Sequence, residues 1–397
     1  MIPAVIACTQ DAGDHNSAMA SVPLRLAVHQ RMPQGEEFHR CWDELVTAME
    51  SVEVFYTWEW AEAILRANSS LAPIIIVGRR GDRLAGVAAL KHEADGYVSF
   101  LTAVTADYCD FVSHPADRCE FVEAVFAELR RMNVMGVRLA NLPTDSVSIA
   151  ALRAAAEETG YSLLAKPAYF CAQVMLDSEC ARLDAAISAR RRIKKLAGAA
   201  SRSGELSVTH VHGWEDFSTE FPQFVTAHIA RFSGSNQLSH LHQPERQNFL
   251  VELAKLLSVK RWVAFSTLKL NTNTIAWNYG FRFAGKWFYY QPAFVNGFER
   301  LSPGTYLLSS IIGAASEDPV INTVELGLGD EDYKRRYTQS GRSTLHVTAH
   351  CSRIQLGKIA FRYHAAQFVK KSSRLEKIVR ACRRKVATTT QNSTIPA

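Results

Sequence analysis

The sequence lacks the long apolar runs, cysteine pairs and catalytic signatures that mark several large classes of protein. No stretch of its 397 residues approaches the ~18–20 consecutive apolar residues that span a bilayer. Its eight cysteines form no Cys-x-x-Cys pair and no Cys/His cluster at zinc spacing, which predicts reduced thiols and no metal. Neither a Gly-x-Ser-x-Gly elbow nor a Walker motif occurs. These absences predict a cytoplasmic protein that is neither a serine hydrolase nor a P-loop enzyme.

Positive charge is concentrated near the C-terminus. The chain carries a net charge of +6, but Lys358 to Lys385 alone has ten Lys or Arg residues against Glu376, a balance of +9 that leaves −3 for the rest. Such a segment is either a solvated amphipathic helix or a contact with nucleic acid or an anionic membrane surface. We favour the first interpretation, because Leu375, Ile378, Val379 and Cys382 recur at helical spacing and can pack on the body.

The same order of predicted elements occurs twice. Each half has a helix, a strand, a tight turn, two further strands, a helix and a strand, which predicts two copies of one domain with mixed α/β sheets. The predicted helices are 36–50, 57–67, 117–132, 146–159, 180–203, 243–257, 303–316 and 331–337. The predicted strands are 24–29, 73–78, 84–90, 97–101, 136–141, 161–165, 169–176, 261–268, 274–283, 287–292, 322–326 and 343–350.

This pattern predicts five segments. They are a flexible leader (1–21), an N-terminal domain (22–178), a basic linker helix (179–204), a C-terminal domain that binds the donor (205–350) and a basic helical tail that ends disordered (351–397). The linker carries Arg190, Arg191, Arg192, Lys194 and Lys195 within six residues. These cations form either a solvated face or a site for a phosphate-bearing ligand, and both interpretations stand.

A second candidate for phosphate binding is the start of the helix at 303–316. Ser302 is a good N-cap, Pro303 suits the first helical position, and Gly304 leaves room for a ligand to approach the backbone. The free N–H groups of the first turn, together with the helix dipole, suit a pyrophosphate. The simpler interpretation is a well-formed helix start with no ligand.

Acid–base residues follow the strand at 322–326. The chain leaves this strand through Gly327 and Gly329, and ligands bind at such openings of α/β sheets. Tyr333 is placed to donate a proton to a leaving thiolate, and Glu325 or Asp330 to accept one from an amine. A packed helix tyrosine is the alternative for Tyr333.

Taken in order, these motifs resemble the GNAT-superfamily branch with a BioF2-like or CelD-like acetyltransferase domain, which is related to the Fem-type aminoacyltransferases. The resemblance covers roughly residues 50–345. It rests on Phe55 to Trp60, Asp107 to Asp110, Arg190 to Leu196, His228 to Phe232, Thr274 to Ala276, Ser302 to Gly304, and Gly327 with Tyr333-Lys334.

The resemblance implies tandem GNAT-like domains and acetyl-CoA or another acyl-CoA as co-substrate. It places the CoA pyrophosphate at Gly304 to Tyr306 and the thioester beside Trp287 to Tyr290. Expected cofactor-binding residues are Tyr290, Gln291, Ser302, Gly304, Thr305 and Tyr306. Expected substrate or phosphate contacts are Arg190, Arg191, Lys194, Arg231, Trp277 and Lys334.

Two departures from the GNAT pattern stand out. Pro303 and Thr305 occupy positions where standard GNAT enzymes have glycine. The corresponding turn of the N-terminal half, His114 to Asp117, has no glycine and carries an acid, so we expect that half to shape the cleft without binding a donor.

The predicted activity is N-acyl transfer to a small-molecule amine by direct attack in the cleft between the halves. Two alternatives stand beside it. One is a Fem-type enzyme with aminoacyl-tRNA as donor, and the other is a non-catalytic scaffold in polysaccharide or envelope biosynthesis.

Overall fold

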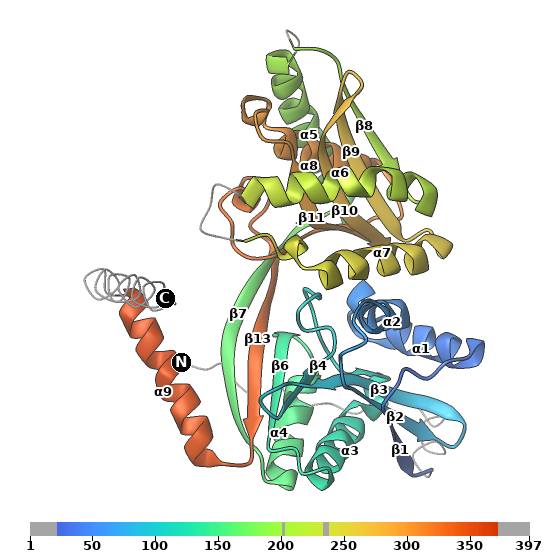
Figure 1. The fold of residues 1–397 in the computed structure, drawn as a ribbon, viewed down its shortest axis with the longest axis vertical. Helices are drawn as coiled ribbons and strands as arrows, with labels where there is room; N and C mark the ends of the chain where they lie inside the picture. Colours follow the sequence, from blue (N-terminus) through green and yellow to red (C-terminus); the bar gives the residue numbers. More distant parts are fainter. Residues whose placement is uncertain (1–21, 201–202, 233–237, 372–397) are drawn as a thin grey trace, which may run out of the picture.

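The computed structural model describes residues 22–200, 203–232 and 238–371. The predicted leader 1–21 and the tail stripe from Leu375 to Cys382 lie outside the described residues. The model is a mixed α/β protein, as predicted (Figure 1). In the described chain, no helix has the length and apolarity needed to cross a bilayer.

The first half runs from β1 to β7. Its elements are β1 (Leu24–His29), α1 (Glu36–Ala48), η2 (Val54–Tyr56), α2 (Trp58–Ala67), β2 (Pro73–Arg80), β3 (Arg83–His92), β4 (Tyr97–Phe100), β5 (Val112–Ser113), η3 (Pro115–Asp117), α3 (Arg118–Arg131), β6 (Gly136–Pro143), α4 (Ser148–Thr159) and β7 (Ser162–Met175).

The second half repeats this order. Its elements are α5 (Glu179–Ala200), β8 (Leu206–Val211), α6 (Trp214–Phe232), η4 (His240–His242), α7 (Pro244–Val259), β9 (Val263–Leu270), β10 (Asn273–Phe283), β11 (Lys286–Phe294), η5 (Glu299–Leu301), α8 (Pro303–Glu317), β12 (Thr323–Leu328), η6 (Lys334–Arg336), β13 (Gly341–His350) and α9 (Arg353–Lys371). Strand β8 was not predicted, and the predicted helix 331–337 is only the 3-10 turn η6.

Thirteen strands of the described chain form one sheet with internal symmetry: twelve lie side by side, and β5 pairs with β3 off this row. Inward from one edge the order is β1, β2, β3, β4, β6, β13, and inward from the other edge it is β8, β9, β10, β11, β12, β7. The two sequences of strands meet at the antiparallel pair β7–β13. The last strand of each half therefore lies in the sheet of the other half: β13 pairs with β6 (Figure 1), and β7 pairs with β12.

This exchange corrects one prediction. The segments 161–165 and 169–176 are a single strand, β7, and it bridges the two halves instead of closing the first. Pro167 lies at an irregularity where β7 pairs with Leu345 of β13, and this proline made the sequence look like two strands.

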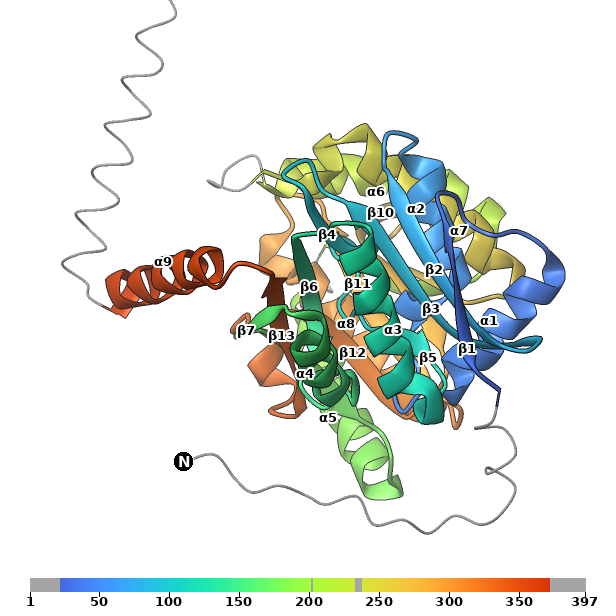
Figure 2. The same ribbon diagram turned by 90° about the horizontal axis from the view of Figure 1, so that it is seen from below.

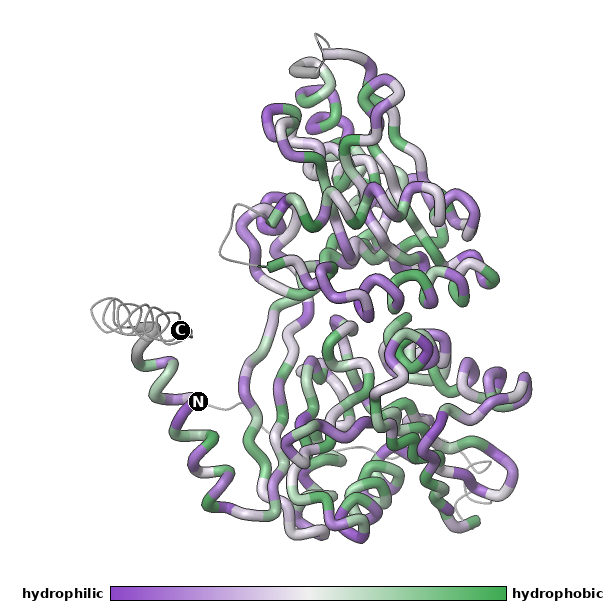
Figure 3. Tube along the Cα trace, viewed as in Figure 1, coloured by the Kyte–Doolittle hydropathy of each residue, from purple (hydrophilic) through white to green (hydrophobic). Residues whose placement is uncertain are grey.

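Helices cover both faces of each half (Figures 1 and 2). Helices α5 and α8 pack together on one face of the second half, and α6 and α7 lie on the other. Apolar residues concentrate in the strands and along the inner sides of the helices, as burial of the central strands requires (Figure 3). Helices α2 and α7 pack against each other between the halves.

An aromatic cluster joins the halves beside this helix pair. The ring centroid of Phe55 lies 5.4 Å from that of Phe288, and the centroid of Trp60 lies 5.3 Å from that of Phe281 and 5.6 Å from that of Tyr290. All five side chains belong to the hydrophobic core or pack against it. The motif from Phe55 to Trp60 therefore fixes how the two halves meet.

Candidate active site

The candidate site begins where two parallel strands separate. Strands β11 and β12 pair only from Lys286–Thr323 to Phe288–Glu325, and beyond these residues the described pairing stops. The main chain of β11 past Phe288 therefore faces an opening in the sheet. Gly327 lies at this opening with φ of +75°, a conformation that favours glycine.

A cavity of about 250 Å³ lies over the start of α8. It is lined by Arg231, Tyr289, Pro292, Phe294, Glu299, Ser302, Pro303, Gly304, Thr305 and Tyr333. The predicted residues Ser302, Gly304 and Thr305 are therefore brought together as expected. Tyr306 is instead buried in the core beneath.

The first turn of α8 presents unpaired backbone donors to this cavity. Ser302 has φ of +48° and its side chain makes no capping hydrogen bond. Its carbonyl accepts the Tyr306 amide at 3.0 Å, whereas the amides of Gly304 and Thr305 have no partner among the described residues. Such a turn, with the positive end of the helix dipole, suits an anion.

A second cavity, of about 470 Å³, continues from the first. The two share Arg231, Tyr289, Pro292 and Tyr333 as lining residues, so they adjoin each other, and together they are called the cleft below. The second cavity is also lined by Ala103, Val104, Thr105, Ala106, Asp107, His228, Phe232, His240, Arg246, Tyr290, Gln291, Leu326, Gly327, Leu328, Glu331 and Lys334. The cleft thus reaches from the start of α8 to loop 101–111 of the first half.

Asp107 is the acid that this loop brings to the opening. A Cβ atom placed on Gly327 would lie 3.3 Å from the Asp107 Oδ2 atom, so the carboxyl lies against the strand exit. Burial raises the pKa of Asp107 to about 7, against the effects of nearby Lys334 and a hydrogen bond from the Leu328 amide. A carboxyl with this pKa suits general-base chemistry near neutral pH.

The loop that carries Asp107 is held from both halves. Asn141 of β6 donates its Nδ2 to the Ala106 carbonyl at 2.8 Å. Tyr290 of β11 donates its hydroxyl to the Thr105 carbonyl at 2.6 Å, so this predicted cofactor residue positions the loop as well as lining the cleft.

Tyr333 lies where the two cavities meet. Burial raises the pKa of its phenol, so the hydroxyl keeps its proton at neutral pH. The neighbouring Lys334 is buried, and its Nζ donates to the carbonyls of Gly327 and Leu328 at 2.9 and 2.8 Å. Lys334 therefore ties η6 to the strand exit and holds Tyr333 at the opening.

Two arginines, Arg231 and Arg246, also line the second cavity. Arg231 donates to the Pro292 carbonyl and its guanidinium lies 4.8 Å from the centre of the Phe294 ring. Neither Arg231 nor Arg246 has a carboxylate partner in the described ranges. Burial lowers the pKa of both His228 and His240 to about 4, so these histidines are neutral at pH 7.

Several predicted contacts lie away from the cleft. Trp277 is buried with its Nε1 donated to Glu220 of α6 at 3.0 Å. Arg190 pairs with Glu317, at the end of α8 farthest from Gly304. The structure brings neither these side chains nor Arg191 and Lys194, which are exposed on α5, to either cavity.

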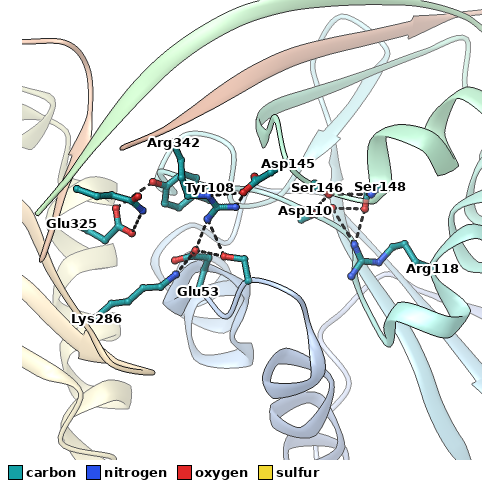
Figure 4. Close-up of polar contacts among 12 residues, drawn as sticks. Glu53, Tyr108, Asp110, Arg118, Asp145, Ser146, Ser148, Lys286, Glu325 and Arg342 are labelled. Atoms are coloured by element: carbon teal, nitrogen blue, oxygen red, sulfur yellow. Dashed lines mark hydrogen bonds and ion pairs between the residues drawn. The ribbon is translucent and has the colours of Figure 1, made fainter. Parts of the chain in front are cut away.

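The two predicted bases also lie outside the cleft. Asp330 is exposed and paired with Arg335. Glu325 is buried, accepting hydrogen bonds from Gln173 Nε2 at 2.6 Å and Tyr108 Oη at 3.2 Å (Figure 4). Burial raises its pKa to about 8.

Glu325 belongs to a polar network between the halves (Figure 4). At its centre, the buried Glu53 carboxylate accepts from Lys286 at 2.5 Å and from Arg342 at 2.8 Å. Arg342 also pairs with Asp145 at 2.8 Å. Lys286 and Arg342 come from the second half and Glu53 and Asp145 from the first, so these ion pairs join the halves.

The corresponding helix start in the first half is occupied by side chains. Asp117, the N-cap of α3, is buried and pairs with Arg80 at 2.7 Å and Arg83 at 2.8 Å. The next residue, Arg118, is also buried and donates to Ser148 Oγ at 2.9 Å, which in turn donates to Asp110 (Figure 4).

Asp107, Tyr289 and Arg246 line the cleft but are not among the site residues predicted from the sequence. Asp107 lies in the motif Asp107 to Asp110 of the first half, whereas the predicted bases, Glu325 and Asp330, flank the glycines of the second half. Among the described residues, no three His, Cys, Asp or Glu side chains are grouped to hold a metal ion.

Comparison with known proteins accounts for this geometry. Residues 188–335 match the family model described as an acetyltransferase (GNAT) domain, and this range includes β11, α8 and β12. This part of the second half is therefore similar to GNAT acetyltransferase domains. No curated protein matches the chain.

Solved structures share the fold of this chain over both halves. FemX has a TM-score of 0.56 at 11% identity, covering 83% of this chain and 98% of FemX. The C-terminal domain of a putative lysylphosphatidylglycerol synthetase from Agrobacterium fabrum has a TM-score of 0.52 at 12% identity, covering 84% and 96%. At these identities the likeness shows the fold, and the predicted tandem GNAT-like architecture is confirmed. Membership of the BioF2-like or CelD-like branch stays a prediction.

Proposed function

We propose that this protein is an N-acyltransferase that uses acyl-CoA and an amine acceptor. The proposal rests chiefly on two adjoining cavities. One lies over the Gly304 and Thr305 amides, which have no partner among the described residues, and the other is lined by Asp107 of the other half. An acyl donor on a phosphate-bearing carrier fits the cavity over α8. An amine acceptor, which must lose a proton, fits the cavity that Asp107 lines.

The start of α8 is the proposed site for the CoA pyrophosphate. The Gly304 and Thr305 amides would donate to its oxygens, and Arg231 would supply positive charge. Glu299 also lines this cavity, with its carboxylate held by the Gly297 amide at 2.9 and 3.0 Å. Its negative charge opposes phosphate and predicts modest affinity for CoA.

The chemistry requires one proton acceptor and one proton donor. The acceptor nitrogen attacks the thioester carbonyl, a C–N bond forms, and the C–S bond breaks. Asp107 takes the proton from the nitrogen, and Tyr333 protonates the departing sulfur. The main chain of β11 past Phe288, which β12 no longer pairs, is placed to polarise the carbonyl.

The donor is tested by calorimetric titration of the full chain with acetyl-CoA, longer acyl-CoA species and charged tRNA. We expect acyl-CoA to bind and acyl transfer to a panel of primary amines to follow. Binding of charged tRNA without acyl-CoA would favour the Fem-type alternative. A folded chain that binds neither would contradict the enzymatic assignment and leave the scaffold interpretation.

A further inference from the structure

Helix α9 leaves a row of large apolar side chains in solvent. Ile354, Phe361 and Phe368 are 73%, 74% and 69% exposed. They are spaced by seven residues, nearly two helical turns, so they form one stripe along the helix. Single exposed apolar residues are ordinary, but an aligned row of three on a helix is not.

The opposite face of α9 holds the helix against the body. Leu356 is buried, and Lys166 of β7 lies 4.8 Å above the Tyr363 ring. Helix α9 extends beside β7 and β13 and stands apart from both lobes in two views (Figures 1 and 2). The apolar stripe therefore points away from the rest of the described chain.

The charge of α9 has one sign. Its sequence contains five Lys or Arg residues and no Asp or Glu. The exposed residues Lys358 and Arg362 lie on one side of the stripe, and Arg353 lies on the other. The excess of Lys and Arg continues in the sequence to Lys385. Cations beside exposed Phe and Ile are typical of helices that lie in an anionic membrane interface.

We propose that the stripe of Ile354, Phe361 and Phe368, with its flanking cations, docks the protein on an anionic phospholipid bilayer. The apolar side chains would enter the boundary between headgroups and acyl chains, while the cations contact lipid phosphates.

The pattern fits a second copy of the chain less well. Two helices that pair need large apolar residues at two positions of each heptad, three or four residues apart. Three or four residues after Ile354 lie Gly357 and Lys358, and after Phe361 lie His364 and Ala365, so the second apolar position is missing. Pairing two such helices would also bring like charges together. Structured RNA would be recognised by the cations but offers no environment for the Ile354 and Phe361 side chains.

The test is co-sedimentation of the full chain with vesicles. We expect binding to phosphatidylcholine vesicles rich in phosphatidylglycerol and not to pure phosphatidylcholine. The double variant Phe361→Ser/Phe368→Ser should bind at least about tenfold more weakly, and Lys358→Gln/Arg362→Gln about fivefold more weakly for each cation removed. Val320→Ser, which changes a 68% exposed apolar residue elsewhere, should bind like the wild type.

Each outcome that would overturn the proposal can be told apart from a loss of folding or of activity. Because the substituted side chains are exposed, circular dichroism should show unchanged folding, and acyl transfer to a soluble amine should be retained. Vesicle binding that the serine variant keeps would overturn the proposal, as would binding to tRNA with no binding to vesicles. Self-association without lipid that the serine variant abolishes would assign the stripe to a second copy instead.

Discussion

The two halves of the sheet open in the same way, but buried ion pairs fill the helix start of the first half, whereas a cavity lies over that of the second. In each half, two parallel strands pair over three residues and then part: β4 with β6, and β11 with β12. A left-handed residue follows in each second strand, Asn141 in β6 and Gly327 in β12. The backbone plan is thus duplicated, and the side chains decide what it does.

The first half fills its own opening. Its helix start is closed by Asp117 and Arg118 in buried ion pairs, and its loop 101–111 is tied to Asn141. The same loop presents Asp107 to the cleft of the second half. We infer that the first half has lost a donor site and instead supplies the base, Asp107, to the cleft of the second half.

The largest effect on activity is expected from substitution of Asp107 in loop 101–111, which reaches from the first half into the cleft. Asp107→Asn should lower kcat/KM by ~10²–10⁴-fold, because the amine loses its proton acceptor. In the wild type, kcat/KM should rise with pH through about 7, as Asp107 loses its proton, and this limb should be absent from the variant. Steady-state kinetics against pH checks both, and Asp330→Asn should match the wild type. Equal losses in the two variants would contradict the assignment.

The next largest effect is expected on the free energy of unfolding, from the ion pairs that join the halves. Glu53→Ala leaves Lys286 and Arg342 without their buried partner and should lower the free energy of unfolding by ~3–5 kcal/mol. Urea denaturation measures this loss. Glu317→Ala, which breaks the exposed pair with Arg190, should change it little. A small effect at Glu53 would show that the halves are joined mainly by the aromatic cluster.

The two helix starts can be compared by matched substitutions. Gly304→Val should weaken acetyl-CoA binding by about tenfold or more, since its side chain would enter the cavity over α8. The fold should survive, because a Cβ atom at Gly304 meets only Phe294, at 3.7 Å. Ala116→Val, at the start of the closed site, should leave the Kd unchanged. Calorimetry measures both; equal weakening would remove the distinction between the halves.

The smallest effect is expected at Asn141, the residue with positive φ at the opening of the first half. Asn141→Gly tolerates φ of +55° but loses the hydrogen bond to the Ala106 carbonyl. Stability should fall by ~1 kcal/mol, with a partial loss of kcat as loop 101–111 loosens. Thermal denaturation and kinetics together test this, and a change in stability with no change in kcat would separate the loop from catalysis.

Local features of the site were predictable from the sequence. Ser302, Pro303 and Gly304 mark the helix start, and the glycines before Tyr333 mark the strand exit; each signal depends on neighbours in the chain. The structure places Ser302, Pro303, Gly304 and Tyr333 around one cavity with Arg231, and their roles in binding stay predictions.

Features that depend on the other half were not predictable. Asp330 follows the glycines in sequence, but its side chain pairs with Arg335, whereas Asp107 reaches the same opening from another domain. The exchange of β7 and β13 escaped prediction for a similar reason. Alternation of residues in a strand reports which face is buried, not which strand lies beside it.

The most direct measurement of the central claim is the number of donor sites. Calorimetric titration of acetyl-CoA into the full chain should give one site per chain, at the start of α8. Two sites per chain, or one site that Gly304→Val leaves intact, would contradict the view that only the second half kept an open cradle.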